Sequence, residues 1–188
     1  EPCEAVWVPG KQHAGYYPGA KRLTVKLLFS PEDGQVLGGQ VVGEAGVDKR
    51  IDVISTTIHF DGTVEDLSGL DLAYAPPYGS AKDINHLAGF AAHNQLREIG
   101  SFTGEPRTNG QLLDVRSKEE FQDHHASGAI HIPLDELRDR VDELDRSQPV
   151  DVMCGIGKRA YYAQRILKQA DFEDVKVIGG GYFLGQHE

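Results

Sequence analysis

The pattern of apolar and polar positions in residues 23–29 predicts a β-strand, because the segment Leu-Thr-Val-Lys-Leu-Leu-Phe begins by alternating between the two. Residues 30–34, Ser-Pro-Glu-Asp-Gly, have the composition of a turn. Residues 35–43 follow as a second strand. The first half of the chain is therefore expected to contain a β-hairpin.

Helical periodicity follows the hairpin. Residues 48–60 carry isoleucines at helical spacing, namely Ile51, Ile54 and Ile58. Residues 63–67 favour a short helix or a turn, and a proline-rich loop occupies residues 73–80. Residues 82–98 predict a longer helix. The expected apolar face of this helix consists of Ile84, Leu87, Ala88 and Ala91.

Strands and helices alternate in the second half of the chain. The expected strands are residues 112–115, 150–153 and 175–178. The expected helices are residues 118–123, 134–144 and 158–170. The inward faces of the last two helices carry Leu134, Leu137, Val141 and Leu144, and Ala163, Ile166, Leu167 and Ala170. Strands separated by helices predict βαβ units and a parallel sheet.

Residues 100–110 (Gly-Ser-Phe-Thr-Gly-Glu-Pro-Arg-Thr-Asn-Gly) are rich in glycine, proline and small polar residues, and we place a domain boundary there. Residues 1–100 are expected to form an α+β domain with an antiparallel sheet and helices. Residues 101–110 are expected to be a linker, and residues 111–188 an α/β domain with a parallel sheet.

The composition is that of an ordinary globular protein, with 39% hydrophobic and 26% charged residues. The formal net charge of −10 argues against a nucleic-acid partner or an anionic membrane, since phosphate binding needs clustered Lys and Arg. No apolar run reaches the roughly 18–20 residues that a membrane span needs, and no signal segment opens the chain.

Two distant cysteines, Cys3 and Cys154, do not make a disulfide framework, so a cytoplasmic, reducing location is expected. No role is assigned to Cys3. The single methionine is Met153 and the sequence begins at Glu1, so we expect a piece of a longer protein.

Cys154 directly follows an expected strand and precedes Gly155, Ile156, Gly157, Lys158 and Arg159, with which an expected helix begins. Sites in open α/β sheets form at the carboxyl ends of strands. A glycine-rich turn there directs backbone N–H groups inward, and the helix N-terminus adds positive potential that suits an anionic sulfur. Lys158 and Arg159 add positive charge, so we expect a nucleophilic thiol. The alternative is a buried structural cysteine, because cysteine is among the most buried residue types.

Several segments of the second half together resemble the rhodanese family. They are Asp114-Val115-Arg116, Glu120-Phe121, residues 128–133 (Gly-Ala-Ile-His-Ile-Pro), the loop from Cys154 to Arg159, and residues 178–181 (Ile-Gly-Gly-Gly). The resemblance covers residues 111–185, with the segments in the family's order. It implies that Cys154 carries sulfane sulfur as a persulfide, held in a loop made of Gly155, Ile156, Gly157, Lys158 and Arg159.

The loop from Cys154 to Arg159 spans six residues, whereas phosphatases of related fold place the arginine one residue further on. This spacing argues against phosphatase activity. The resemblance has departures: Gly155 stands where many thiosulfate-using members carry Arg, and Tyr182-Phe183 replaces the family's usual tryptophan. A less basic loop favours a small persulfide or polysulfide as the donor.

Other polar residues of the second half have structural explanations. Asp114 and Arg116 are expected to pair or cap rather than to bind a ligand. The doublet His124-His125 has no partners at metal-site spacing, so no metal is expected.

Segments of the first half resemble the dimerisation domain of flavin-dependent pyridine nucleotide–disulfide oxidoreductases. They are residues 13–20 (His-Ala-Gly-Tyr-Tyr-Pro-Gly-Ala), 48–52 (Asp-Lys-Arg-Ile-Asp) and 74–83 (Tyr-Ala-Pro-Pro-Tyr-Gly-Ser-Ala-Lys-Asp). The resemblance is strongest to the coenzyme A disulfide reductase and NADH-dependent persulfide reductase branch, some members of which carry a C-terminal rhodanese domain. It implies a homodimer in which Tyr16 and Tyr74 reach the active site of the partner subunit. Interface packing is the alternative role of both tyrosines.

Together the two resemblances imply sulfur transfer within the C-terminal part of a flavin-dependent reductase. Cys154 is expected to take sulfur from a sulfane-sulfur donor and pass it to an acceptor thiol. The resemblance implies FAD, NADH and coenzyme A for the full-length parent, bound with upstream flavin and NAD domains. Because no Gly-x-Gly-x-x-Gly follows a strand, this chain is expected to hold no cofactor and to reduce nothing alone. The alternative is a non-catalytic dimerisation and binding module with an inert rhodanese-like domain.

Overall fold

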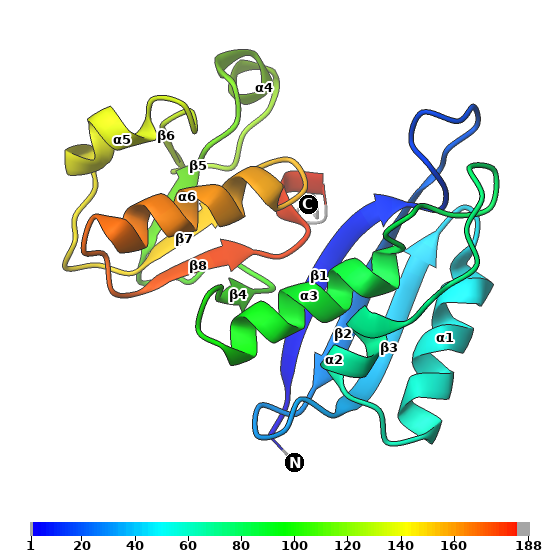
Figure 1. Ribbon diagram of the computed structural model, residues 1–188. Coiled ribbons are helices and arrows are strands. Elements are labelled where there is room, and N and C mark those ends of the chain that lie inside the picture. Colours follow the sequence, from blue (N-terminus) through cyan, green and yellow to red (C-terminus); the bar gives the residue numbers. More distant parts are fainter. Residues whose placement is uncertain (1, 184–188) are drawn as a thin grey trace. The chain divides into compact units, whose positions relative to one another are not determined.

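The computed structural model describes residues 2–183, and it divides into two compact units, Glu1–Ile99 and Gly100–Glu188 (Figure 1). Residue 1 and residues 184–188, which include the expected end of the second domain, lie outside the described part. Each unit has its own sheet, three-stranded in the first and five-stranded in the second. Each is therefore described by itself.

The first sheet is antiparallel, with the order β1-β2-β3, and it consists of β1 (Glu4–Lys11), β2 (Arg22–Phe29) and β3 (Val36–Gly43). The predicted hairpin is confirmed as β2 and β3. In β2 every second side chain is buried, because alternate side chains of a strand point to opposite faces of the sheet. The buried residues of β2 are Leu23, Val25, Leu27 and Phe29.

Strand β1 was not predicted from the sequence. It contains Pro9, which lacks a backbone N–H and reads as a strand breaker. The order of the sheet explains why proline is tolerated, since β1 lies at the edge and pairs only with β2. Val6 of β1 is fully buried opposite Leu27 of β2, so the edge strand still contributes to the core.

Three helices accompany this sheet: α1 (Val47–His59), α2 (Val64–Gly69) and α3 (Ile84–Leu96). All three elements were predicted. The side chains of Thr63 and Asp83 cap α2 and α3 by accepting backbone N–H groups of the first turn. These polar residues explain where the two helices begin.

The predicted apolar face of α3 is partly wrong. Leu87 is 38% exposed, and Ala91 is only partly buried. The buried positions of the helix are Ile84, Asn85, His86, Ala88, Gly89 and Ala92. At Gly89 a Cβ atom would collide with the backbone of α2, so α2 and α3 pack closely on this side. Counting apolar side chains misplaces the face, because a glycine and an asparagine belong to it.

The second sheet is parallel throughout, with the order β4-β8-β7-β5-β6 (Figure 1). Its strands are β4 (Phe102–Thr103), β5 (Gln111–Asp114), β6 (Ile130–His131), β7 (Val150–Met153) and β8 (Val175–Ile178). The parallel sheet and its three predicted strands, β5, β7 and β8, are confirmed. Strands β4 and β6 have two residues each, which is too short for a periodic signal.

The segment expected to be a linker, residues 101–110, contributes to this unit. Strand β4 pairs with the edge of the sheet at β8. Arg107 binds Asp151 through its backbone N–H at 2.6 Å and through Nε at 2.9 Å, and its Nη1 reaches Asp174 at 2.5 Å. The segment is therefore a structured part of the second unit, although its composition is that of a loop.

The helices of the second unit are α4 (Lys118–Asp123), α5 (Leu137–Arg140) and α6 (Lys158–Gln169), with the short 3₁₀ turns η1 (Val141–Glu143) and η2 (Gly181–Phe183). The single helix predicted over 134–144 is wrong. Arg140, with φ −118°, ends the α-helical geometry, and the chain continues as η1. Helix α6 packs on β7 and β8, as the inward positions Ala163 and Leu167 predict.

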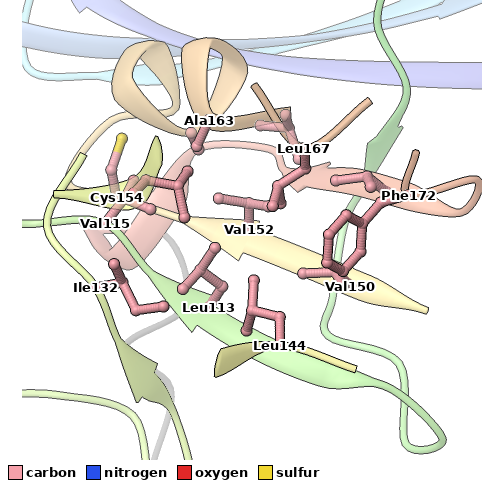
Figure 2. Packing of buried hydrophobic residues seen from close by; sticks show 14 residues of the cluster. Leu113, Val115, Ile132, Leu144, Val150, Val152, Cys154, Ala163, Leu167 and Phe172 are labelled. Carbon is pink, nitrogen blue, oxygen red and sulfur yellow. The ribbon is translucent and has the colours of Figure 1, made fainter. Parts of the chain in front are cut away.

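The core of the second unit is a cluster of buried residues to which the sheet, α5 and α6 contribute (Figure 2). Its buried residues include Leu113, Val152 and Leu167, which are fully shielded from solvent. Cys154 belongs to the same cluster and lies at one end of it, as Figure 2 shows. The cysteine therefore sits where the apolar core meets the edge at which β7 ends.

Replacing Leu27 with alanine is expected to destabilise the first unit by about 2–5 kcal/mol. The Leu27 side chain is fully buried, so its removal leaves a cavity in the core. Trp7, the single tryptophan, lies in β1, so its fluorescence during urea unfolding reports this unit. The control is Val42→Ala in β3, where the side chain is 73% exposed and the expected loss is under about 1 kcal/mol. Equal losses in the two variants would contradict the described burial.

Candidate functional site

Cys154 follows the last residue of β7, and α6 begins four residues later. Between them Gly157 has φ 97°, in the left-handed region that favours glycine, and it is the N-cap of α6. This turn directs the Gly157 N–H at the sulfur, with the nitrogen 3.1 Å from Sγ. The described geometry is a thiol that accepts a backbone hydrogen bond at a helix N-terminus.

The position of β7 makes this loop central to the second unit. Strand β7 lies between β8 and β5, so Cys154 stands at the carboxyl edge of the middle of the sheet. In open α/β sheets this is where sites form. The Cys154 side chain is fully buried in the unit, which keeps bulk water from the sulfur and strengthens the effect of nearby charges and dipoles.

The predicted loop residues differ in exposure. Gly155 is buried behind the cysteine, whereas Ile156 is 47% exposed. Lys158 is exposed, with its Nζ 6.0 Å from the centroid of the Tyr162 ring. Its ammonium group therefore lies on the outer face of the first turn of α6.

Arg159 is held by Glu120. Its Nη1 and Nη2 donate to the two carboxylate oxygens at 2.6 and 2.8 Å. The hydrogen bonds from Arg159 are the main cause that lowers the pKa of Glu120 to about 2. The same contact raises the pKa of Arg159, and the neighbouring Cys154 side chain adds to that increase. The guanidinium group therefore lies within the influence of both the carboxylate and the sulfur.

Glu120 also caps α4, because it accepts the backbone N–H of Ser117 at 3.0 Å while the Ser117 hydroxyl accepts the N–H of Glu120. Sequence reasoning missed the link between Glu120 and Arg159, which are far apart in the chain. The spacing Ser-x-x-Glu is a signal that places the carboxylate at the start of α4, but it does not identify the arginine.

The backbone after β8 supports the loop from the other side. The N–H of Tyr182 donates to the carbonyl oxygen of Cys154 at 2.8 Å. At Gly181, with φ 61°, a Cβ atom would collide with that same carbonyl oxygen. This position requires glycine because the chain passes so close to the loop. Gly181 belongs to the Ile-Gly-Gly-Gly segment that resembles the rhodanese family, but the sequence alone does not reveal this role.

Asp114 and Arg116 form a buried ion pair, as predicted. Arg116 Nη2 lies 2.7 Å from the Asp114 carboxylate and 2.7 Å from the carbonyl oxygen of His124, to which it also donates. Its guanidinium carbon lies 4.0 Å from the centroid of the Tyr182 ring. The pair therefore joins the end of β5 to the segment that supports Cys154.

The tyrosines predicted for the first unit lie together. The hydroxyl oxygens of Tyr16 and Tyr74 are 3.0 Å apart, and both side chains are exposed. Their hydrogen bond is the main cause that raises the pKa of Tyr74 above its ordinary value. Tyr16 lies in the loop between β1 and β2, and Tyr74 in the loop between α2 and α3. A hydrogen bond joins the two loops, in which the Ala14 N–H donates to the carbonyl oxygen of Gly79 at 2.8 Å. Figure 1 shows these loops side by side.

Other candidates lie outside this arrangement. Within residues 2–183, no group of three or more His, Cys, Asp or Glu side chains is placed to hold a metal ion. Cys3 is an exposed free cysteine just before β1. None of the helices described here is long and apolar enough to span a membrane.

Family models match both parts of the chain. The model for the pyridine nucleotide-disulphide oxidoreductase dimerisation domain matches residues 4–84. The model for the rhodanese-like domain matches residues 102–187. The order of the two matches agrees with the order of the two units.

Solved structures with both parts are also similar. A reduced CoADR-RHD from Bacillus anthracis is 41% identical with a TM-score of 0.90, and an NAD-dependent persulfide reductase from A. fulgidus is 40% identical with a TM-score of 0.86. Each comparison covers 97% of this chain and 34% of the other. The chain thus spans about a third of the length of these relatives.

A coenzyme A disulfide reductase from Staphylococcus epidermidis is 42% identical over 80 residues, which are 43% of this chain and 18% of that reductase. Together, the two family models and these relatives agree with the antiparallel and parallel sheets described above. In sequence order, the chain therefore carries a dimerisation domain of the pyridine nucleotide-disulphide oxidoreductase kind followed by a rhodanese-like domain.

Proposed function

We propose that the second unit is a sulfurtransferase whose Cys154 carries sulfane sulfur as a persulfide. The observation that carries this proposal is the hydrogen bond from the Gly157 N–H to Cys154 Sγ, within a turn between a central strand and a helix N-terminus. An anionic sulfur is stabilised by such a donor and by the positive end of the helix. A buried structural cysteine needs neither feature.

The proposed reaction has two displacement steps at sulfur. The Cys154 thiolate attacks the outer sulfur of a donor, a new S–S bond forms, and the donor's S–S bond breaks. The leaving group departs with the bonding electron pair and takes a proton from water when it is a thiolate. An acceptor thiolate then attacks the outer sulfur of the Cys154 persulfide, and Cys154 leaves as a thiolate. The oxidation states balance without a further reactant.

The loop residues have distinct proposed roles. The backbone N–H groups of Gly155, Ile156, Gly157, Lys158 and Arg159 surround the outer sulfur, which is the logic of an oxyanion hole applied to sulfur. Gly157 provides the left-handed turn that the loop requires. The Lys158 side chain adds positive charge at the mouth of the loop, whereas the Arg159 guanidinium group is paired with Glu120.

The first unit is proposed to be the dimerisation domain of a homodimer, and the second unit its rhodanese domain. Tyr16 and Tyr74 are proposed to enter the active site of the partner subunit, where a phenol can donate a proton to a leaving thiolate. The exposure of both hydroxyl-bearing side chains and their mutual hydrogen bond support this assignment.

The full-length parent is proposed to be a cytoplasmic coenzyme A disulfide, persulfide or polysulfide reductase that uses FAD, NADH and coenzyme A. FAD and NADH are proposed to bind the upstream domains of the parent rather than this chain. In the parent, the sulfur carried on Cys154 is proposed to be delivered to the flavin domain for reduction. The chain alone is proposed to transfer sulfur without reducing it.

Replacing Cys154 with serine is expected to abolish sulfur loading, because a hydroxyl group is a poor nucleophile toward sulfur and forms no persulfide. Intact mass spectrometry after brief exposure to glutathione persulfide measures the gain of one sulfur atom. Cys3→Ser is the matched control and should load as the native chain does, since Cys3 is exposed and remote in sequence. If the native chain gains no sulfur from persulfide, polysulfide or thiosulfate, the unit is an inert binding module.

Replacing Gly181 with alanine is expected to slow sulfur loading by about tenfold to a hundredfold, because the new Cβ displaces the Cys154 carbonyl and with it the loop. Gly128→Ala is the control, since Gly128 also has a positive φ of 76° but has no neighbour in the way of a Cβ. Both variants are strained by about 1 kcal/mol or more. Intact mass spectrometry under single-turnover conditions measures the sulfur-loading rate of each variant. Equal loading rates in the two variants would contradict a supporting role of Gly181.

Removing the Tyr16 hydroxyl with Tyr16→Phe is expected to lower the pKa of Tyr74 toward its ordinary value, because the hydrogen bond that favours the neutral phenol is lost. A pH titration followed by NMR of ¹³Cζ-labelled tyrosine measures this directly. The neighbouring Tyr17→Phe exchange serves as the control and should leave Tyr74 unchanged. A Tyr74 titration that is insensitive to Tyr16 would exclude a coupled pair.

A further inference from the structure

The loop at Cys154 carries two cationic side chains, and they are not equivalent. Lys158 is exposed and lies beside the ring of Tyr162. Arg159 is bound by both carboxylate oxygens of Glu120 at 2.6 and 2.8 Å. A bidentate pair of this kind fixes the direction of the guanidinium group and offsets its charge. The sequence shows two cations in the loop, whereas the structure leaves one of them neutralised.

Glu120 is itself held in place. It accepts the Ser117 N–H at 3.0 Å as part of the cap of α4, so its carboxylate cannot turn away from Arg159 without breaking that cap. Its pKa of about 2 means that the carboxylate stays ionised throughout the physiological range. A fixed negative charge therefore stands next to the arginine of the loop at all relevant pH values.

This negative charge matters for the choice of sulfur donor. In thiosulfate the sulfane sulfur is bonded to a sulfonate group, so two negative charges must come close to the loop. In an organic persulfide the sulfane sulfur is bonded to a carbon-bearing sulfur, so the reacting S–S group carries at most a single negative charge. A carboxylate near the loop repels the first donor more strongly than the second, because Coulomb energy falls with distance and rises with charge.

We propose that Glu120 is a specificity-determining residue, which by neutralising Arg159 directs the loop toward organic persulfides and away from dianionic donors such as thiosulfate. This inference rests on the proposed function of Cys154. Loading from an organic persulfide forms the Cys154 S–S bond, breaks the donor S–S bond and releases a thiolate. Loading from thiosulfate forms the same bond and releases sulfite.

The test compares donors in single-turnover loading of the whole chain, with the rate of sulfur gain on Cys154 measured by intact mass. Glutathione persulfide and thiosulfate are used separately, and the ratio of their rates is the readout. Glu120→Gln keeps the length of the side chain and an oxygen that can cap α4 but removes the charge. It is expected to raise the thiosulfate rate relative to the persulfide rate by about tenfold.

Glu119→Gln is the matched control, because Glu119 is the neighbouring exposed carboxylate on α4, and its loss changes the net charge of the chain equally. It is expected to leave the donor ratio unchanged. In the double variant Glu120→Gln with Arg159→Gln, the rise in the ratio of the thiosulfate rate to the persulfide rate is expected to disappear. This rise depends on the guanidinium group that loss of the Glu120 charge leaves unpaired. If Glu120→Gln does not fold, Glu120→Asn, which removes the same charge, should shift the ratio in the same direction.

The outcomes separate the two proposals. Absence of loading from either donor in the native chain overturns the sulfurtransferase proposal itself. Loading in the native chain with an unchanged donor ratio in Glu120→Gln and Glu120→Asn overturns the role of Glu120 alone. A ratio that shifts equally in Glu119→Gln also overturns it, because net charge would then suffice.

Discussion

The buried ion pair between Asp114 and Arg116 holds together the segments that surround Cys154. Arg116 binds the carboxylate at the end of β5, the carbonyl oxygen of His124 and the face of the Tyr182 ring. Tyr182 in turn donates its N–H to Cys154. Removing one partner of a buried pair leaves an uncompensated charge and costs about 3–5 kcal/mol. The geometry of the sulfur loop therefore depends on a pair that does not contact the sulfur.

Local sequence predicted the parts of this site that are close in the chain. The strand, the glycine-rich turn and the helix around Cys154 are each determined by residues that are close in sequence. The same is true of the hairpin of the first unit. Contacts between distant residues were not predicted, since periodicity contains no information on them. Glu120 meets Arg159 through the tertiary fold, and the need for glycine at Gly181 arises from a close approach to Cys154.

The errors in the predicted fold have the same origin. Strand β1 was missed because Pro9 is unfavourable in a strand unless the sheet order places that strand at an edge. The face of α3 was misplaced because burial of Gly89 depends on how closely α2 approaches. The two-residue strands β4 and β6 exist only through pairing with the sheet. In each case the missing information is the identity of the neighbouring element. Short segments are the hardest to predict, because they contain little local signal of their own.

The most direct measurement for the central claim is a crystal structure of the chain after exposure to an organic persulfide. The account predicts one additional sulfur atom bonded to Cys154 Sγ, surrounded by the backbone N–H groups of residues 155–159, with Arg159 still bound to Glu120. An unmodified Cys154 with the additional sulfur on Cys3, or an outer sulfur that points away from those N–H groups, would contradict it.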